Sequence, residues 1–230
     1  MRRLGLTTTR DRGLGLAGTV AALGLDPVIV PCIEVTAASE AVIGAARLEA
    51  ERSDWLILTS PRTVGLLWPG MAMPETNVAV VGQPTAQAVR DAGGRVAVVG
   101  DGGATELAQR ISPKTSGLSV FFPHAAGADS TTIDVLEDSG ATVRTSVVYD
   151  TRSIAPPDDA VDAVVFASPS AVTGWFISRD VEGVATGVIG ETTAAELAGR
   201  GHTYDVVAPH PSMDELIRLI ARHLRERSSV

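Results

Sequence analysis

The feature of this sequence that most limits its fold is a repeated apolar run that stops at Ser-Pro. Residues 54–64 read DWLILTSPRTV, and residues 162–172 read DAVVFASPSAV, 108 positions later. The same offset pairs further residues downstream: Gly82 with Gly190, Thr85 with Thr193, Ala86 with Ala194, and Gly93 with Gly201. A match kept over this length indicates one supersecondary unit that occurs twice.

Two weaker matches extend the repeat over most of the chain. An offset of 109 aligns ATELAQRI (104–111) with MDELIRLI (213–220), and residues 4–31 resemble residues 120–147. The chain is therefore a short segment followed by a long one, and then a second short and a second long segment. We expect the two copies of each segment to fold alike.

Short runs rich in valine, isoleucine and leucine alternate with segments of helical length. This alternation is typical of α/β proteins with parallel sheets. We expect strands near residues 3–7, 27–30, 54–58, 77–81, 95–99, 118–122, 142–148, 162–166, 184–189 and 204–208. We expect helices near residues 14–24, 39–51, 61–68, 84–92, 104–111, 127–138, 169–178, 192–199 and 212–226.

The joins between the four segments indicate which of them share a domain. The first long segment reaches the second short one through only SPKTSG (112–117), a loop length common within domains. The joins PCIEVTAA (31–38) and YDTRSIAPPDDAV (149–161) are longer and contain proline, as domain crossings often do. An inserted domain is therefore favoured over two contiguous ones.

The resulting domain prediction is a discontinuous arrangement. Residues 36–148 would form one α/β domain, inserted into a second domain made of residues 1–32 and 152–230. Segments 31–37 and 147–153 would be the hinge, and two crossings side by side would leave a cleft between the domains.

Composition excludes several classes of function. The net charge of −8 argues against a nucleic-acid partner. No apolar run approaches the ~20 residues of a membrane-spanning helix, and the N-terminus lacks the apolar core of a secretory signal. Cys32 is the only cysteine, and the four histidines show no ligand spacing, so we expect no disulfide and no metal. We expect a cytoplasmic protein without a membrane partner.

One glycine motif looks like a dinucleotide fingerprint. GLGLAG (13–18) satisfies GxGxxG, and Glu34 lies about 20 residues further on. The first glycine of that fingerprint belongs in the turn directly after the strand, but residues 8–12 intervene here. A nucleotide-dependent oxidoreductase is therefore the weakest of the hypotheses, and we expect no cofactor.

The ends of the repeated strands carry candidate binding residues. Ser60 and Ser168 precede proline at the first position of a helix, and Thr85 and Thr193 follow glycine turns. These residues can cap helices and do nothing more. The alternative is that free N–H groups and hydroxyls at four helix N-termini bind anions. Arg10 follows the first strand, where it could pair with a ligand carboxylate.

The motifs taken together resemble the uroporphyrinogen-III synthase family. The matching motifs cover almost the whole chain, in order: TTR (8–10), DWLILTSPRTV (54–64), VAVVGQPTAQAVRDAG (78–93), VVYDT (147–151), DAVVFASPSAVTGWF (162–176), GVIGETTAAELAGRG (187–201) and VVAPHPSMDELI (206–217). The resemblance implies two α/β domains with parallel, flavodoxin-like three-layer sheets, one inserted into the other and joined by a two-stranded linker.

The resemblance also implies the reaction. Hydroxymethylbilane, the linear substrate, would be cyclised to uroporphyrinogen III with inversion of ring D through a spiro-pyrrolenine, in the interdomain cleft. Tyr149 matches the linker tyrosine that would assist departure of the substrate hydroxyl. Substrate-binding roles would fall to six residues: Arg10, Ser60, Arg62, Thr85, Ser168 and Thr193. We expect no cofactor, no metal, the small-molecule substrate as the partner, and a monomer.

Residues 123–133, PHAAGADSTTI, depart from the family pattern because they contain no arginine. An acidic protein that binds a substrate with many carboxylates needs local positive charge, here from Arg10, Arg62 and helix N-termini. The missing arginine keeps open an alternative, a non-catalytic two-domain binder or sensor of a tetrapyrrole or other polyanion.

Overall fold

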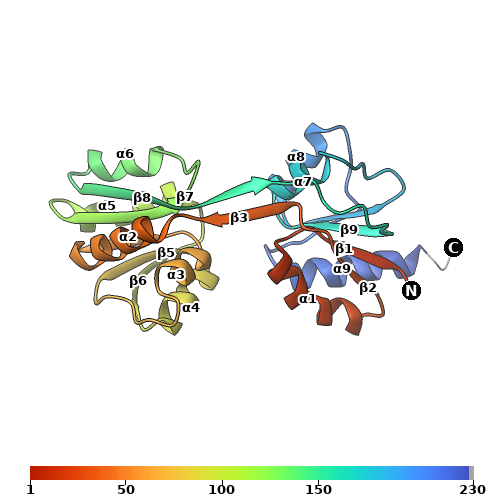
Figure 1. Cartoon of the computed structure of the whole chain (residues 1–230). Helices are drawn as coiled ribbons and strands as arrows, with labels where there is room; N and C mark the ends of the chain where they lie inside the picture. Colours follow the sequence, from red (N-terminus) through yellow and green to blue (C-terminus); the bar gives the residue numbers. More distant parts are fainter. Residues whose placement is uncertain (228–230) are drawn as a thin grey trace. The chain divides into compact units, whose positions relative to one another are not determined.

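The computed structural model describes residues 1–227, and Figure 1 labels the elements. The chain divides into two compact units. Unit 1 comprises Met1–Val35 together with the chain from Thr151 onward, and unit 2 is Thr36–Asp150. The middle of the chain thus forms a unit of its own between two parts of the other.

Unit 1 contains a five-stranded parallel sheet in the order β11-β10-β9-β1-β2. Its strands are β1 (Arg3–Leu6), β2 (Asp26–Ile29), β9 (Ala163–Phe166), β10 (Ala185–Val188) and β11 (Val206–Val207). Helices α1 (Arg10–Ala22) and α9 (Met213–Glu226) cover one face, and α7 (Pro169–Trp175) and α8 (Glu191–Gly199) cover the other.

The strands of unit 1 are buried on both faces, as a parallel sheet between two helical layers requires. In β9, Ala163 and Val165 belong to the apolar cluster beneath α9, whereas Val164 and Phe166 belong to the cluster with Trp175 of α7. Among residues 1–227, the amphipathic α9 supplies six of the fourteen buried residues of the first cluster, more than any other element. Its Ser212 hydroxyl caps the helix by accepting the N–H of Glu215 at 3.3 Å.

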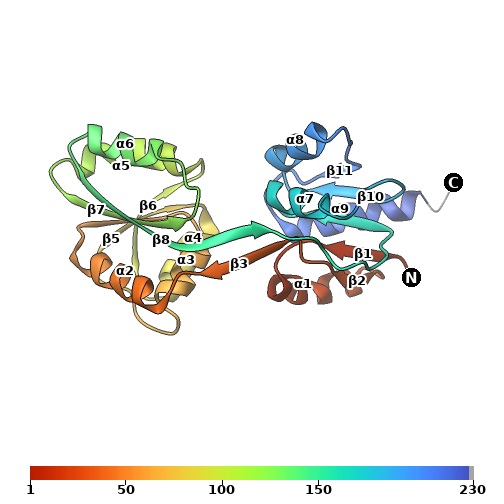
Figure 2. The same ribbon diagram turned by 45° about the horizontal axis from the view of Figure 1, so that its top comes forward.

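Unit 2 contains a sheet in the order β3-β8-β7-β4-β5-β6. Its strands are β3 (Ile33–Ala37), β4 (Trp55–Leu58), β5 (Asn77–Val81), β6 (Arg95–Gly100), β7 (Ser119–Ala125) and β8 (Thr142–Ser153). Helices α5 (Ala104–Thr115) and α6 (Thr131–Asp138) cover one face, and α2 (Glu40–Arg52), α3 (Pro61–Leu67) and α4 (Gln83–Asp91) cover the other (Figure 2). The α5–α6 side buries Ile57, Val120 and Phe122.

The sequence repeat explains the topology of both sheets. The short segments supply β1–β2 and β7–β8, and the long segments supply β9–β11 and β4–β6. In space the order is β2-β1-β9-β10-β11 in unit 1 and β8-β7-β4-β5-β6 in unit 2, which is the same order. If the strands of each unit are numbered with the two of the short segment first and the three of the long segment after them, their order in the sheet is 2-1-3-4-5. This is the flavodoxin-like order. The predicted α/β class with parallel three-layer sheets is confirmed.

Two strands, β3 and β8, run from one unit into the other and are neighbours in the sheet order. Main-chain hydrogen bonds hold them at both ends: Ile154 N–H donates to Cys32 O, and Ala38 N–H donates to Val148 O, each at 2.9 Å. No strand was expected at 33–37, because this segment falls in the proline-containing join 31–38. Pairing with β8 makes this segment extended, as the family resemblance implies.

Several predicted helix ends differ from the structure: α6 begins at Thr131 rather than near 127, α7 ends at Trp175 rather than near 178, and α1 and α5 also differ. Helix α1 begins at Arg10, four residues before the predicted start, and Gly13 N–H already donates to Thr9 O at 2.9 Å. Helix α5 runs on to Thr115 through Pro113, which was predicted to lie in a loop. Proline cannot donate to Gln109 O, but the Ser112 hydroxyl donates to this carbonyl at 2.9 Å instead.

Within residues 1–227, no helix combines the length and the apolar character needed to cross a bilayer.

Candidate functional site

Each sheet has one place where the strand order reverses, and ligands of open α/β sheets bind outside the carboxyl ends of the strands there. In unit 1 this place lies between β1 and β9, and in unit 2 it lies between β7 and β4. We call the carboxyl ends of these strand pairs, with the residues that follow, the switch-point edge of each unit. The Ser-Pro sequences lie at these edges.

Ser60 and Ser168 are the N-caps of α3 and α7, as their structural interpretation predicted. The Ser60 hydroxyl accepts the N–H of Arg62 at 3.2 Å, and the Ser168 hydroxyl accepts the N–H of Ala171 at 3.2 Å. Ser168 Oγ also lies 3.0 Å from Ser170 Oγ. Both hydroxyls are half-buried and can still donate their own proton.

Thr85 and Thr193 lie in the first turns of α4 and α8 and are almost completely buried. Gly82 precedes α4 with φ 76° and ψ 156°, a conformation that favours glycine, and its N–H donates to Gly100 O at 2.8 Å. Thr193 Oγ1 is buried and has no hydrogen-bond partner in the part of the chain that the structure describes.

Arg10 is the first residue of α1 at the switch-point edge of unit 1. Its side chain is exposed, and its guanidinium has no partner within residues 1–227. The segment before it is fixed, because the buried Thr7 hydroxyl donates to Val165 O of the neighbouring strand β9 at 2.9 Å. A cation at a helix N-terminus is unfavourable by itself, so an anion there would be bound by both the helix and Arg10.

Tyr149 lies on β8 beside the switch-point edge of unit 2, and it is 8% exposed. Its main chain pairs with Ala125 of β7, and its carbonyl accepts the N–H of Ala126 at 2.8 Å. The Arg62 guanidinium lies 5.6 Å from the centroid of the Tyr149 ring. The structure therefore brings Tyr149, Arg62 and Ser60 to one edge of unit 2.

The two edges carry their arginines on different strands. In unit 1 Arg10 follows β1, and Ser170 follows β9. In unit 2 Arg62 follows β4, at the position that matches Ser170, while Ala126 follows β7. In unit 2 the arginine at this edge therefore follows β4, the neighbour of β7 in the sheet. The sequence did not reveal that the arginine changes strand between the units, or that Ser170 lies at the edge of unit 1. Both became visible only when the order of the strands in each sheet was known.

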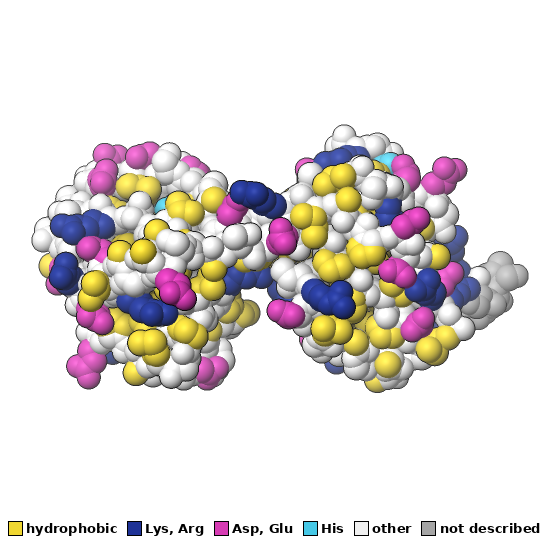
Figure 3. Space-filling model, in the orientation of Figure 1, with side chains coloured by type: hydrophobic (Ala, Val, Ile, Leu, Met, Phe, Trp, Pro, Cys, Tyr) yellow, Lys and Arg dark blue, Asp and Glu magenta, His cyan; other side chains and the backbone are white. Residues whose placement is uncertain are grey.

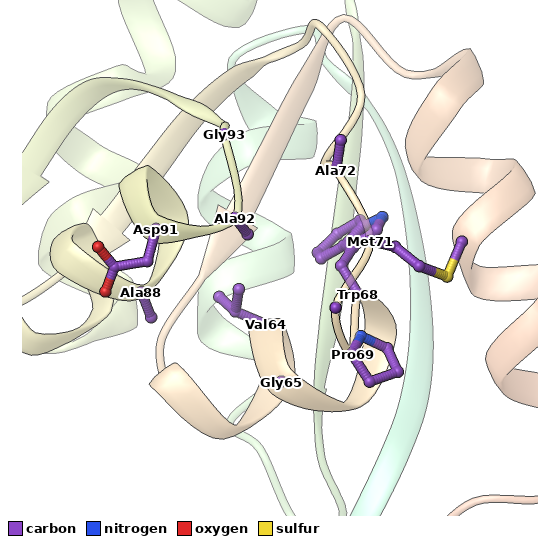
Figure 4. A pocket seen from close by; sticks show the side chains of 11 residues that line it. Val64, Gly65, Trp68, Pro69, Met71, Ala72, Ala88, Asp91, Ala92 and Gly93 are labelled. Carbon is purple, nitrogen blue, oxygen red and sulfur yellow. The ribbon is translucent and has the colours of Figure 1, made fainter.

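A groove of about 650 Å³ lies elsewhere on unit 2, between α3 and α4 (Figure 4). Val64 and Trp68 line one side, and Ala88 and Ala92 line the other. None of the predicted site residues lines it. At the matching positions of unit 1, Phe176 packs under Arg200, which is paired with Glu196 at 2.8 Å.

The described residues offer few other groups suited to catalysis or metal binding. Within residues 1–227 no group of three acidic, histidine or cysteine side chains could hold a metal ion. Burial raises the pKa of the Cys32 thiol to about 12, so Cys32 is a poor nucleophile at neutral pH. On the face drawn in Figure 3, acidic and basic side chains are interspersed in both units.

A family model described as uroporphyrinogen-III synthase HemD matches residues 15–218. The chain belongs to the uroporphyrinogen-III synthase family. The resemblance found in the motifs is thereby confirmed. Six of the seven proposed site residues of this synthase family member lie inside the matched segment, and Arg10 lies before it.

Relatives of this synthase family member cover nearly its whole length. The chloroplastic uroporphyrinogen-III synthase of Oryza sativa subsp. japonica is 26% identical over 249 residues, which cover 96% of this chain and 80% of that protein. The solved uroporphyrinogen-III synthetase from Helicobacter pylori 26695 is 17% identical, covers 97% of this chain and 100% of that chain, and has a TM-score of 0.67. A mutant uroporphyrinogen III synthase from the extremely thermophilic bacterium Thermus thermophilus, 17% identical over 98% of this chain and 100% of that one, has a TM-score of 0.61.

Proposed function

We propose that this chain cyclises hydroxymethylbilane to uroporphyrinogen III and inverts ring D in the process. The observation that carries the proposal is the family match over residues 15–218, which contains Tyr149 and the binding residues of both units except Arg10. The contacts of these residues support it, since arginine, helix N-termini and unpartnered hydroxyls are suited to the carboxylates of such a substrate.

The proposed reaction removes one molecule of water. The hydroxyl group leaves ring A as the pyrrole N–H loses its proton, which produces an azafulvene. The substituted carbon of ring D then attacks the azafulvene carbon and forms the spiro-pyrrolenine. Fragmentation and closure through the other α-carbon of ring D, followed by loss of its proton, complete the macrocycle. The Tyr149 hydroxyl would donate a hydrogen bond to the departing oxygen.

Most of the catalytic effect is proposed to come from substrate position rather than from a strong acid or base. Hydroxymethylbilane closes unaided to isomer I, so the protein must hold the chain ends in the geometry that favours the spiro route. In unit 1 we assign carboxylate binding to Arg10, Ser168 and Thr193. In unit 2 we assign it to Ser60, Arg62 and Thr85. No cofactor is required by these steps.

The test is to generate hydroxymethylbilane enzymatically, add the protein, and separate isomers I and III by chromatography after oxidation. Formation of isomer III above the protein-free control supports the proposal. Isomer I alone at the uncatalysed rate would contradict it. Thr186→Val is a control variant that should still form isomer III. Thr186 lies at the start of β10 rather than at its carboxyl end, and its hydroxyl donates to Thr203 O at 3.2 Å.

The second candidate function is a non-catalytic binder or sensor of a tetrapyrrole or other polyanion. The observation that favours it is the absence of arginine from residues 123–133. The same assay distinguishes the two functions. A binder would take up uroporphyrinogen without increasing the yield of isomer III, whereas the enzyme would do both.

We further propose that the protein acts as a cytoplasmic monomer with no nucleic-acid or membrane partner. The net charge of −8 supports the absence of a nucleic-acid partner. We also propose the predicted domain boundaries, 1–32 with 152–230 and 36–148, with hinges at 31–37 and 147–153. The unit boundaries after Val35 and Asp150 support these hinges. Light scattering tests the monomer, and limited proteolysis tests the hinges.

A further inference from the structure

The position of Tyr149 depends on an irregularity in strand β8. His124 of β7 pairs with Val147, but Ala125, the next residue, pairs with Tyr149. Strand β8 therefore has one extra residue, Val148, at this point. Val148 and Tyr149, on either side of this shift, are both buried. Such bulges redirect side chains, and they are common beside active sites.

A side chain from a second element, α3, lies near the Tyr149 ring. Arg62 is the second residue of α3, where the Ser60 hydroxyl accepts its main-chain N–H. Its side chain is half-buried, and its guanidinium lies 5.6 Å from the centroid of the Tyr149 ring. This distance is within the range of an attractive cation–π contact. A planar guanidinium presents a larger contact area to an aromatic ring than a compact ammonium group does. It therefore restricts rotation of the ring more strongly.

We propose that Arg62 is a positioning residue for Tyr149, in addition to any contact it makes with substrate. By holding the ring, Arg62 fixes the direction in which the Tyr149 hydroxyl donates its hydrogen bond. This role rests on the function proposed for Tyr149 above. The repeat supports the pairing of the two residues, because unit 1 has neither of them. Its matching positions hold Ser170 and, when the offset of the short segments is continued, Ile33.

The first test measures the ring itself and does not depend on activity. The chain has two tyrosines, Tyr149 and Tyr204, so a Tyr204→Phe background labelled with ¹³C-tyrosine leaves one ring to observe by NMR. We expect Arg62→Met to shift the Tyr149 ring resonances and make its ring flips faster, with Arg62→Lys intermediate. Arg90→Met, on the exposed face of α4, is the matched control and should leave them unchanged. Unchanged ring resonances in Arg62→Met, measured in folded protein, would overturn the proposal.

The second test is a double-mutant cycle in turnover. Arg62→Met should lower kcat about tenfold, an effect of the size a partly buried cation–π contact permits. In a Tyr149→Phe background, which keeps the ring and lacks the hydroxyl, Arg62→Met should lower kcat by less than about twofold. An equal loss of kcat in both backgrounds, or a rise in KM alone, would make Arg62 a substrate-binding residue only and overturn the positioning role.

The two tests separate this proposal from the proposed function. If the wild-type protein forms no isomer III, the proposed function fails, while the NMR result still decides whether Arg62 holds the ring. Arg62→Lys guards against a variant that does not fold, because it keeps the charge. Its kcat should lie between those of the wild type and Arg62→Met, and a kcat below that of Arg62→Met would contradict the proposal.

Discussion

Gly174 of α7 lies against the carbonyl group of Cys32, so closely that a methyl group on Gly174 would overlap the carbonyl oxygen. The carbonyl of Ile154 lies on the same side, and Ile154 N–H donates to Cys32 O. The backbone of α7 thus packs directly on the unit 1 ends of the two strands that pass between the units. Ser153 adds a further link, because its hydroxyl donates to Ser170 O at 2.8 Å.

Gly174→Ala should therefore destabilise the protein. The methyl group meets backbone atoms, which cannot rotate away, so we expect a loss of about 2–4 kcal/mol in the free energy of unfolding. Urea unfolding followed by circular dichroism measures it. Gly44→Ala in α2 is the control, because no atom lies near the added methyl, and it should be neutral or stabilising by up to about 1 kcal/mol. Equal stabilities of the two variants would contradict the packing argument.

Thr193→Val tests whether the unpartnered hydroxyl of Thr193 forms a hydrogen bond with the substrate. Removal of a buried hydroxyl without a partner breaks no internal hydrogen bond, so the free energy of unfolding should stay the same or rise by about 1 kcal/mol. If substrate uses this hydroxyl, KM should rise about threefold to tenfold. Steady-state kinetics and urea unfolding give the two quantities.

The control for Thr193→Val is Thr186→Val, which removes a hydroxyl that does have a partner. We expect the opposite pattern from this control, with about 1 kcal/mol lost in stability and no change in KM. An unchanged KM in Thr193→Val would remove this residue from the site.

Tyr149→Phe should lower kcat more than it weakens the binding of product. The phenyl ring keeps the packing beside Arg62, and only the hydroxyl proposed to assist departure of the substrate oxygen is lost. We expect kcat to fall about 10² fold, as for removal of one general acid. Rapid-quench turnover and equilibrium binding of uroporphyrinogen III check the two parts, and full activity would exclude a catalytic role for the hydroxyl.

Stability at alkaline pH should depend on Cys32. Desolvation raises the pKa of the thiol from 9.0 to about 12 in the folded protein, against a smaller opposing effect from Arg179. The folded state therefore binds more protons than the unfolded state between pH 9 and 12. The contribution of the buried thiol is fully present below about pH 9 and is lost as the pH rises toward 12.

The variant Cys32→Ala measures this contribution. Between pH 8 and pH 10 the wild type should lose about 1 kcal/mol more unfolding free energy than Cys32→Ala, since other alkaline groups titrate in both proteins. Parallel losses in the two proteins would mean that the thiol is not desolvated. A thiol reagent at pH 8 should also label the folded wild type slowly, at a rate limited by opening of the structure.

Arg10→Met should raise KM and weaken its dependence on salt. The protein carries a net charge of −8, so attraction of a polyanion must come from local groups, and ionic strength screens this attraction. We expect KM to rise about fivefold at low salt and less at high salt. Arg90→Met changes the net charge equally at an exposed position of α4, and its KM should match that of the wild type. The same rise in both variants would indicate a general effect of net charge.

The sequence by itself determined the α/β class, the repeated strand-to-helix units and the helix caps. These features depend on local contacts. The hydroxyls of Ser60, Ser168 and Ser212 accept N–H groups within three residues, and an apolar run favours a buried strand whichever sheet it joins. Helix ends were less predictable, because the hydroxyl of Ser112 compensates for Pro113 and lets α5 continue.

Only the tertiary structure decided the arrangement of the site. Arg62 and Tyr149 are far apart in the sequence and meet because the strand order places β7 between β8 and β4. The shifted register at Val148 and the unpartnered Thr193 hydroxyl have no local signal either. Both features depend on which side chains and carbonyl groups from distant segments lie beside them. These neighbours are determined only by the packing of the complete sheet.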